Sequence, residues 1–406
     1  MSLLLPLLLA VPLAGSVALL VLPPGLGDRV AVRLGVVTAG LTALLSVWVA
    51  VATPTTDVAW VPSLGLRLHL GVDGISSPLV LLTTGLTLLC MVYSLKVLPE
   101  AGRPRGLIGL LLLLEVGMLG TFVALDLLLF FVFFEVVLVP MWFVIAQWGD
   151  GSDPAARLRA ANTFILYTLL GSAVMLLGIL LVGAKAGTFD IAVLTERAGA
   201  GIPHSVQVLA FGAMALGLAV KAPMWPLHSW LPDAHTAAPT VGSVLLAGVL
   251  LKMGTYGLIR IAVPVVPGGA STLAPWLGAF AVIGIVYGAL ACLAQRDLKR
   301  LIAFSSVGHM GFVLLGIATL TPVGINGALF ANVAHGLITG LLFFLAGAIK
   351  DRHHTARLDE LGGGLYARLP RLGGLLAFAA IASLGLPGLA GFCGEMLTLL
   401  GAFRPA

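Results

Sequence analysis

The chain has 406 residues, of which 59% are hydrophobic and only 10% carry a charge, and its formal net charge is +5. A soluble globular domain has about 25% charged residues, so this composition excludes an ordinary soluble protein. The mean hydropathy of +1.10 over the whole length predicts a polytopic membrane protein in which apolar side chains face lipid or one another.

Apolar runs of the length needed to cross a bilayer recur along the whole chain. A helix needs about 20 residues to span about 30 Å of hydrocarbon, so the sequence predicts about twelve spans. These apolar runs predict an all-α transmembrane helix bundle that forms a single domain over residues 1–406. The spans are expected roughly at 3–22, 31–53, 75–98, 106–125, 127–148, 162–184, 206–231, 239–263, 274–294, 301–320, 325–349 and 373–403. The connections at 54–74 and 185–205 are expected to be surface loops or short amphipathic pieces without site chemistry.

Basic residues gather in alternate loops between the predicted spans. Fifteen of the 22 Lys and Arg residues, Lys299 among them, fall in the odd-numbered loops, and five fall on the other side. Because cytoplasmic loops carry an excess of Lys and Arg, this distribution predicts a multi-pass protein with its N-terminus outside. The positive charge is therefore a topology signal and indicates no nucleic-acid partner. The remaining two lysines, Lys221 and Lys252, belong to no loop.

Glu115 and Glu135 are the first ionisable residues well inside predicted spans. They lie near the middle of the fourth and fifth spans. A charged side chain at the bilayer centre costs about 2.5 to 3.5 kcal/mol on insertion scales, so each one requires an explanation. Asp126, Asp233 and Arg260 lie at span ends and are expected to be solvated.

Lys221 and Lys252 occupy the seventh and eighth spans. Lys252 has apolar residues on both sides over more than two turns, so its ammonium cannot easily reach water. Pro223 and Pro226 remove backbone donors beside Lys221, which predicts a broken helix. Broken backbone at membrane depth is tolerated only against protein or a water-filled cavity, so we expect a hydrated cavity beside Lys221.

His309, His335 and Glu395 continue this series in the last three spans. Both histidines lie roughly mid-span, and His titrates nearest to physiological pH, so the two could relay protons. Glu395 follows a Gly-Leu-Pro-Gly sequence at residues 385–388, which again places an ionisable group beside interrupted backbone.

The whole set of buried groups favours proton transfer, although each residue alone allows a structural interpretation. A single buried Glu, Lys or His can fix helix packing through an ion pair or a hydrogen bond. So many groups in different spans are too costly to attribute to packing alone. A pair formed by Glu135 and Lys221 would act as a switch, because moving the carboxylate changes how firmly the lysine holds its proton.

The sequence offers no motif for a cofactor or a metal ion. Cys90, Cys292 and Cys393 lie apart in apolar surroundings, without a C-x-x-C pair. No G-x-G-x-x-G loop or haem motif occurs. We therefore expect packing roles for the cysteines, and neither a cofactor nor a metal in this chain.

One long stretch, at residues 221–260, reads KAPMWPLHSWLPDAHTAAPTVGSVLLAGVLLKMGTYGLIR. It resembles the signature of the antiporter-like membrane subunits of respiratory complex I, NADH:quinone oxidoreductase. Residues 124–149, 296–316 and 384–395 support the resemblance in the expected order, so it covers essentially the whole chain. The chain is most similar to the M-type, proton-translocating subunits, because the L-type, N-type and Mrp antiporter subunits usually have Lys at the position of Glu395.

The resemblance implies a subunit that moves protons across the membrane, driven by redox chemistry in other subunits. It also implies broken helices and two inverted repeats, with a first half-channel at about 106–263 and an incomplete second one at about 274–403. The roles that it implies are a half-channel pair for Glu135 and Lys221, a central bridge for Lys252, a continuing axis for His309 and His335, an outlet for Glu395 and an accessory acid for Glu115.

The resemblance further implies partners and a location. NADH, FMN, iron–sulfur clusters and quinone are expected on partner subunits, within a hetero-oligomer that includes L-type and N-type chains and lipids. The expected location is the cell membrane of a bacterium, and the heavy use of Ala, Gly, Val and Arg also hints at a GC-rich bacterial genome.

Two rival functions and one departure stay open at this point. The first rival is an Mrp-type sodium/proton antiporter subunit, against which Glu395 weighs. The second is a non-pumping structural membrane subunit, in which the buried charges only lock helices together. The family has about fourteen spans, whereas this chain stops soon after Glu395, so we expect the sequence to be incomplete.

Overall fold

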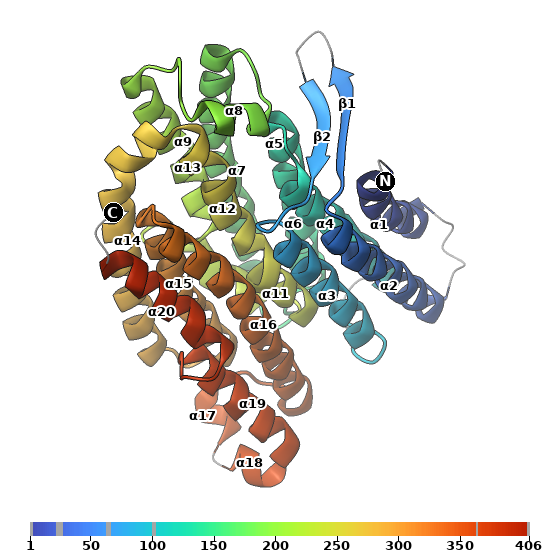
Figure 1. Cartoon of the computed structure of the whole chain (residues 1–406). Helices are drawn as coiled ribbons and strands as arrows, with labels where there is room; N and C mark the ends of the chain where they lie inside the picture. Colours follow the sequence, from blue (N-terminus) through green and yellow to red (C-terminus); the bar gives the residue numbers. More distant parts are fainter. Residues whose placement is uncertain (1–2, 22–26, 62–65, 100–102, 363, 404–406) are drawn as a thin grey trace.

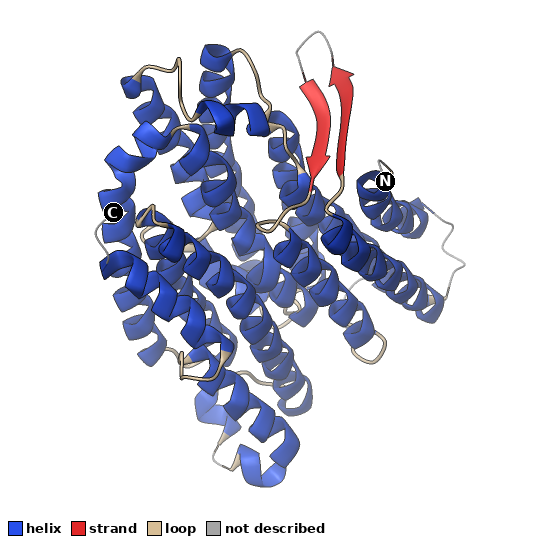
Figure 2. Ribbon diagram, in the orientation of Figure 1, coloured by secondary structure: helices blue, strands red, loops and turns tan. Residues whose placement is uncertain are grey.

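The computed structural model describes residues 3–21, 27–61, 66–99, 103–362 and 364–403. Helices make up almost all of this part of the chain and pack together as one bundle (Figure 2). Among the described residues, eleven helices are long and apolar enough to cross a membrane. The predicted all-α transmembrane bundle is confirmed, and the last predicted span is present as two shorter helices.

The spanning helices follow one another in the predicted order (Figure 1). Their bounds are α1 (Leu4–Val21), α2 (Asp28–Ala52), α3 (Ser77–Ser94), α4 (Pro104–Val123), α5 (Leu127–Val136) with α6 (Leu138–Trp148), α7 (Pro154–Ala186), α9 (His204–Lys221), the central helix described below, α14 (Pro267–Leu293), α15 (Leu298–Ala318) and α16 (Pro322–His353). The shorter helices are α8 (Ile191–Arg197), α10 (Trp230–Ala237), α17 (Leu358–Leu361), α18 (Leu365–Arg368), α19 (Pro370–Ser383) and α20 (Ala390–Phe403).

One continuous helix in the middle of the bundle carries Lys252. It consists of α11 (Thr240–Leu245), η2 (Leu246–Leu250), α12 (Leu251–Gly257), η3 (Leu258–Ala262) and α13 (Val263–Val265), where η marks π-helical turns. In η2 the amide of Leu251 donates to the carbonyl oxygen of Leu246, five residues back instead of four. This helix is the most deeply buried of the described spans. Such π-turns inside α-helices recur at functional sites.

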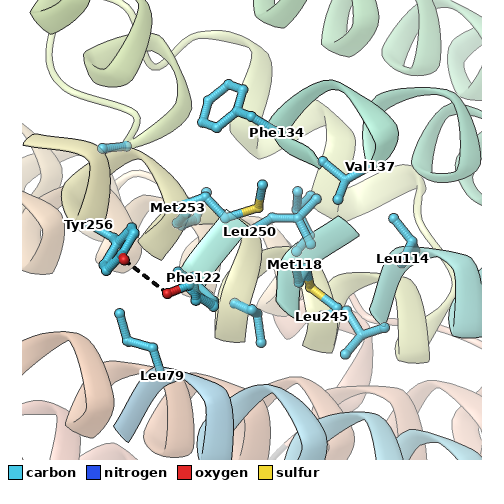
Figure 3. Close-up of a cluster of buried hydrophobic side chains, with 14 of the residues drawn as sticks. Leu79, Leu114, Met118, Phe122, Phe134, Val137, Leu245, Leu250, Met253 and Tyr256 are labelled. Atoms are coloured by element: carbon cyan, nitrogen blue, oxygen red, sulfur yellow. Dashed lines mark hydrogen bonds between the residues drawn. The ribbon is translucent and has the colours of Figure 1, made fainter. Parts of the chain in front are cut away.

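The core around the central helix is apolar and aromatic. Met118 and Phe122 of α4 belong to one buried cluster with Leu250, Met253 and Tyr256 of the central helix (Figure 3). The Tyr256 hydroxyl donates to the carbonyl oxygen of Phe122 at 2.9 Å, and the two rings meet edge-on at 5.2 Å between centroids. Because a buried Tyr hydroxyl needs a partner, this bond fixes the position of the central helix against α4.

Two predicted helix breaks are present. α9 ends at Lys221, and Pro223 and Pro226 lie in the irregular segment that follows, where the Trp225–Pro226 peptide bond is cis. The last span breaks between α19 and α20. Gly385 and Gly388 turn the chain there with φ of 66° and 92°, a conformation that residues with a Cβ rarely adopt.

A third break, beside Glu135, was not predicted. The expected span at 127–148 is divided at Val137, so that Glu135 lies in the last turn of α5. Pro140, three residues further on, has no amide hydrogen to donate to the carbonyl oxygen of Val136, which weakens the helix at this point. Glu135, Lys221 and Glu395 therefore all lie next to irregular backbone.

The connection at 54–74 forms an antiparallel β-hairpin, which corrects the expectation of a loop or an amphipathic piece. β1 (Thr55–Val61) pairs with β2 (Leu66–Gly71), starting with Thr55 opposite Gly71. Threonine, valine and tryptophan favour a pleated strand, but so short a pattern is hard to distinguish beside long apolar spans. The hairpin and α8 lie at one end of the bundle, and α17 and α18 lie at the other (Figure 1).

Candidate functional site

Four of the predicted site residues meet in one continuous row. Lys252 Nζ lies 2.6 Å from His335 Nδ1 on α16, and it also donates to the Ala247 carbonyl oxygen at 2.5 Å. The rings of His335 and His309 meet edge to face with centroids 5.4 Å apart. His309 Nδ1 lies 3.2 Å from Glu395 Oε1 on α20. The row therefore connects the centre of the bundle to its last broken helix.

A small cavity accompanies the outer half of this row. It has a volume of about 20 Å³ and is lined by His309, His335, Glu395 and neighbouring apolar residues. A cavity of this size can hold about one water molecule. The second ring nitrogen of His309 lies 2.8 Å from the Ser383 hydroxyl, at the end of α19, so the ring has a polar group on both sides. These contacts fix the ring orientation between Glu395 and Ser383.

Glu135 and Lys221 are not in direct contact. Among the described residues, no ion pair within 4.0 Å joins them, and Lys221 Nζ and Glu135 Oε1 have no hydrogen-bond partner. Lys221 is 1% exposed, whereas Glu135 is half-buried. The two groups are still within electrostatic reach of each other. The predicted pairing of Glu135 with Lys221 therefore stays a prediction.

The central helix lies against the end of α9 at Gly254. A Cβ at this position would come within 2.5 Å of the Leu218 carbonyl oxygen and 3.0 Å of the Ala222 Cβ. Glycine is therefore required for this close approach of two backbones. Because Gly254 is two residues from Lys252 and Ala222 is next to Lys221, the contact brings the two lysine-bearing segments together.

Glu115 lies apart from the row. Its side chain is fully buried in α4, and neither carboxylate oxygen has a hydrogen-bond partner among the described residues. The sequence placed Glu115 correctly inside a span. The contacts of the described residues do not bring it together with the other six.

Two further buried ionisable residues, His235 and Lys299, were not among the predicted site residues. His235 of α10 is fully buried and stacks on Phe343 at 4.6 Å between ring centroids, and neither ring nitrogen has a partner among the described residues. Lys299 was expected in a cytoplasmic loop, but it is 3% exposed and donates to the Ala238 carbonyl oxygen at 2.9 Å. His235 is within electrostatic reach of both Lys299 and Lys252. The only sequence signal for His235 was its place directly after the broken helix.

A large cavity with several charged residues in its wall opens beside Lys299. Its volume is about 630 Å³, and it lies between the ends of α3, α6 and α16 and the starts of α11 and α15. Asp150, in the loop after α6, forms an ion pair with Lys350 at its wall. Burial acts to raise the pKa of Asp150, but the Lys350 ammonium and the Ser152 amide outweigh it, so this pKa lies below its usual value. This cavity lies beside Lys299, whereas the hydrated cavity expected beside Lys221 stays a prediction.

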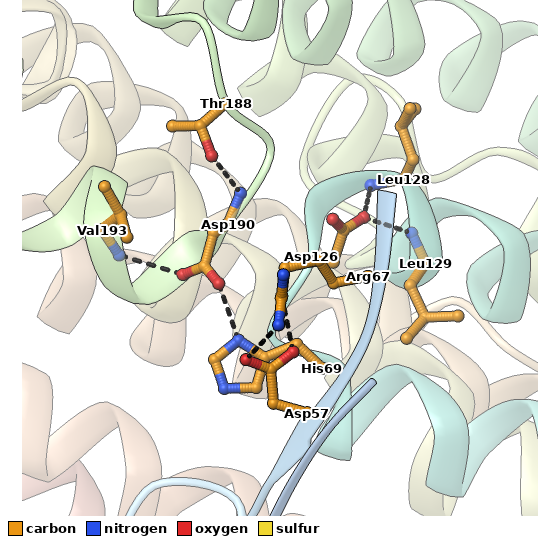
Figure 4. A network of polar contacts seen from close by, with 9 residues as sticks. All are labelled: Asp57, Arg67, His69, Asp126, Leu128, Leu129, Thr188, Asp190 and Val193. Carbon is orange, nitrogen blue, oxygen red and sulfur yellow. Dashed lines mark hydrogen bonds and ion pairs between the residues drawn. The ribbon is translucent and has the colours of Figure 1, made fainter. Parts of the chain in front are cut away.

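A polar network holds the opposite end of the bundle together. Asp126, expected to be solvated, is instead 1% exposed, because its Oδ1 accepts from the Leu128 and Leu129 amides at 2.9 and 3.0 Å and caps α5. Burial raises the pKa of Asp126. Figure 4 shows this cap beside the contact of His69 with Asp190, 2.8 Å long, which ties β2 to the start of α8. The loop region expected to lack any site chemistry therefore anchors the helix that carries Glu135.

Three further ion pairs lie near the ends of the bundle. Two of them hold Arg260 and Asp233, which were expected to be solvated. Arg67 and Asp57, also in Figure 4, pair across the hairpin at 2.6 Å, and the arginine lowers the pKa of Asp57. Arg260 pairs with Asp73 at 2.6 Å and is only partly exposed. Asp233 pairs with Arg300 at 2.6 Å and is exposed, as expected.

The described residues contain no group of three His, Cys, Asp or Glu side chains that could hold a metal ion. Cys90 is buried, Cys292 is half-buried and Cys393 is exposed, and all three are free thiols.

Comparison with known proteins places this chain among membrane subunits of respiratory enzymes. A family described as "NADH:quinone oxidoreductase/Mrp antiporter, TM" matches residues 124–405. NADH-quinone oxidoreductase subunit M of Rhodobacter capsulatus is 43% identical over 99% of this chain and 80% of its own length. The same subunit of Rickettsia prowazekii is 37% identical over 93% of this chain and 77% of its own length.

Two solved structures are also similar to this chain over almost its whole length. A chain of respiratory complex I from Thermus thermophilus with bound NADH matches with a TM-score of 0.88 and 33% identity, over 98% of this chain and 82% of that chain. A chain of the Mrp complex from Dietzia sp. matches with a TM-score of 0.84 and 26% identity, over 98% of this chain but only 43% of that chain.

Proposed function

The chain belongs to the family of antiporter-like membrane subunits of NADH:quinone oxidoreductase, and we propose that it moves protons through a row of buried ionisable side chains. It is a multi-pass membrane subunit of complex I. The observation that carries the proposal is the contact row from Lys252 through His335 and His309 to Glu395. Groups that exchange protons at these separations, in an apolar bundle, need few intervening water molecules to form a path.

The large cavity beside Lys299 would give protons access to one end of the path. By the distribution of Lys and Arg this end faces the cytoplasm, and the N-terminus lies outside. A proton would pass from the cavity to Lys299, then to His235, and from there to Lys252 and His335, with which His235 is within electrostatic reach. Glu395, in the last broken helix, would deliver it toward the outside.

Glu135 and Lys221 would form the first half-channel, over residues 106–263, and would reach Lys252 through the close contact at Gly254. Glu115 would serve as an accessory acid. Residues 274–403 would supply the second half-channel. When Glu135 closes on Lys221, the carboxylate stabilises the ammonium, and when it withdraws, Lys221 releases its proton more readily.

The energy for this movement comes from outside the chain. Moving one charge across the membrane costs about 2.3 kcal/mol per 100 mV. NADH, FMN, iron–sulfur clusters and quinone would bind partner subunits, and L-type and N-type chains would be its neighbours in a hetero-oligomer in the cell membrane of a bacterium. An isolated chain should therefore not pump.

The test replaces Glu135 or Lys252 with Ala in the assembled complex in membranes. NADH-driven proton uptake should fall by about tenfold or more, since removing a proton carrier at such a site costs at least this factor. NADH oxidation by an artificial electron acceptor reports how much complex has assembled, and it should stay near the wild-type level. Lys185→Ala, at an exposed lysine at the end of α7, is the matched control.

Two outcomes would favour the rival functions. Unchanged pumping in both variants would indicate a structural subunit in which the charges only lock helices. Sodium-dependent proton exchange in vesicles, unaffected by loss of NADH oxidation, would indicate an Mrp-type antiporter subunit instead.

A further inference from the structure

The ammonium group of Lys221 faces aromatic rings in place of a carboxylate. Nζ lies 5.1 Å from the ring centroid of Phe134 on α5 and 5.9 Å from that of Phe164 on α7. The lysine has no hydrogen-bond partner among the described residues and is shielded from solvent. The two ring faces are therefore the groups that meet its charge.

Both rings are held in place by neighbours. Phe164 packs against Trp230 with centroids 5.4 Å apart, and the Trp230 indole N–H donates to the carbonyl oxygen of Val220 at 3.0 Å. Val220 directly precedes Lys221, so this bond ties the position of Phe164 to the broken end of α9. Phe134 lies in the buried cluster around the central helix, near Val137 (Figure 3).

A ring face distinguishes the two protonation states of a lysine. The negative face of the aromatic quadrupole attracts an ammonium group, and this attraction is strongest where water is excluded. A neutral amine gains almost nothing from the same contact. The two rings therefore stabilise the protonated form of Lys221 while Glu135 is withdrawn.

We propose that Phe134 and Phe164 form an aromatic clamp, which holds the protonated Lys221 apart from Glu135 between proton-transfer steps. The inference rests on the proposed function of Lys221 as a proton carrier and adds two positioning residues to it. Phe134 directly precedes Glu135 on α5, so the same helix segment presents the clamp and the carboxylate to one lysine. A rotation of this segment by about 100°, the angle between successive helix residues, would exchange one for the other, and the break beside Val137 lies where the segment ends.

The test changes the electronics of the ring and leaves its shape almost unaltered. Mono-, di- and trifluorophenylalanine are incorporated at position 134 of the chain, in the assembled complex. Fluorine withdraws electron density from the ring face, so NADH-driven proton uptake per assembled complex should fall stepwise, by about tenfold over the series. The same series at position 164 should cause a smaller fall, because this ring is farther from Nζ.

Phe130 is the matched control for this series. It lies one turn earlier on α5 and is 1% exposed, like Phe134, and its ring does not meet Lys221 in the described part of the chain. Fluorination at position 130 should change proton uptake less than about twofold. A flat response at both 134 and 164, or an equal fall at 130, overturns the clamp.

Lys221→Ala separates this inference from the function on which it rests. If Lys221→Ala abolishes proton uptake while the fluorine series are flat, the clamp fails and the proposed path stands. If Lys221→Ala pumps at the wild-type rate, the role of Lys221 as a carrier fails, and the clamp fails with it.

Discussion

Lys252 and His335 meet across the contact between the central helix and α16, with 2.6 Å between Nζ and Nδ1. At this separation the two nitrogens are hydrogen-bond partners. Because the ring of His335 also lies edge to face with that of His309, this one bond joins the lysine at the centre of the bundle to the last two spans.

His335→Gln should interrupt the path at this bond. Glutamine keeps a polar side chain of similar size but cannot take up a proton, so NADH-driven proton uptake should fall by about tenfold or more. The amount of assembled complex, measured by NADH oxidation with an artificial acceptor, should stay the same. His204→Gln, at an exposed histidine at the start of α9, is the control and should pump normally. Full pumping by His335→Gln would contradict a path through this residue.

Gly254→Ala should separate the central helix from the end of α9. The added methyl group would meet backbone atoms of Leu218 and Ala222, which cannot move away as a side chain would. Overpacking of this kind costs about 1 to 3 kcal/mol, so both thermal stability and coupled activity should fall. Gly85→Ala in α3 adds a methyl group where no atom lies within 4 Å, and it should be neutral or stabilising. Equal effects of the two substitutions would refute the close-contact argument.

Asp150→Asn should remove a pH-dependent part of the stability at the mouth of the large cavity. The pKa of Asp150 is lower in the folded protein than in the unfolded chain, so its ion pair with Lys350 contributes fully above the unfolded value of about 3.9. This contribution is lost as the pH falls through the folded pKa. Because the pair is partly exposed, we expect it to contribute about 1 kcal/mol to the free energy of unfolding.

Thermal unfolding of the detergent-purified protein between about pH 7 and pH 3 measures this effect. Asp150→Asn should lower the unfolding temperature at neutral pH. The difference in unfolding temperature between the variant and the wild type should become smaller as the pH falls. Glu196→Gln, at an exposed carboxylate of α8 at the other end of the bundle, should leave the dependence of the unfolding temperature on pH unchanged. A constant difference at every pH would show that the carboxylate does not act through its charge.

The positions of the spans and of the buried charges could be read from the sequence, because each is a local property. Lys252 stands out since the residues around it are apolar for several turns. The partners of these charges could not be read in this way. Lys252 and His335 are 83 positions apart, and only the packing of α16 against the central helix brings them together.

Residues near span ends were assigned less well, for a physical reason. Hydropathy alone cannot separate a charge in water from one that the bundle covers with a carbonyl or an amide. Lys299 was counted as a loop residue although the Ala238 carbonyl oxygen accepts from it inside the protein. Asp126 was expected in water, yet it is buried and two amides at the start of α5 donate to its Oδ1. In both cases the covering group comes from backbone geometry, which composition does not encode.

The π-turn over Leu246–Leu250 makes the register of the central helix depend on local helix geometry as well as on residue identity. A π-turn holds one residue more than a regular turn, so rewinding the same residues as a regular α-helix would rotate everything that follows by about 100°. Lys252 would then point away from His335 even though every ionisable residue was retained. A substitution in this apolar segment that straightens the π-turn would thus interrupt the row as thoroughly as the loss of the lysine itself, although the segment contains no titratable group.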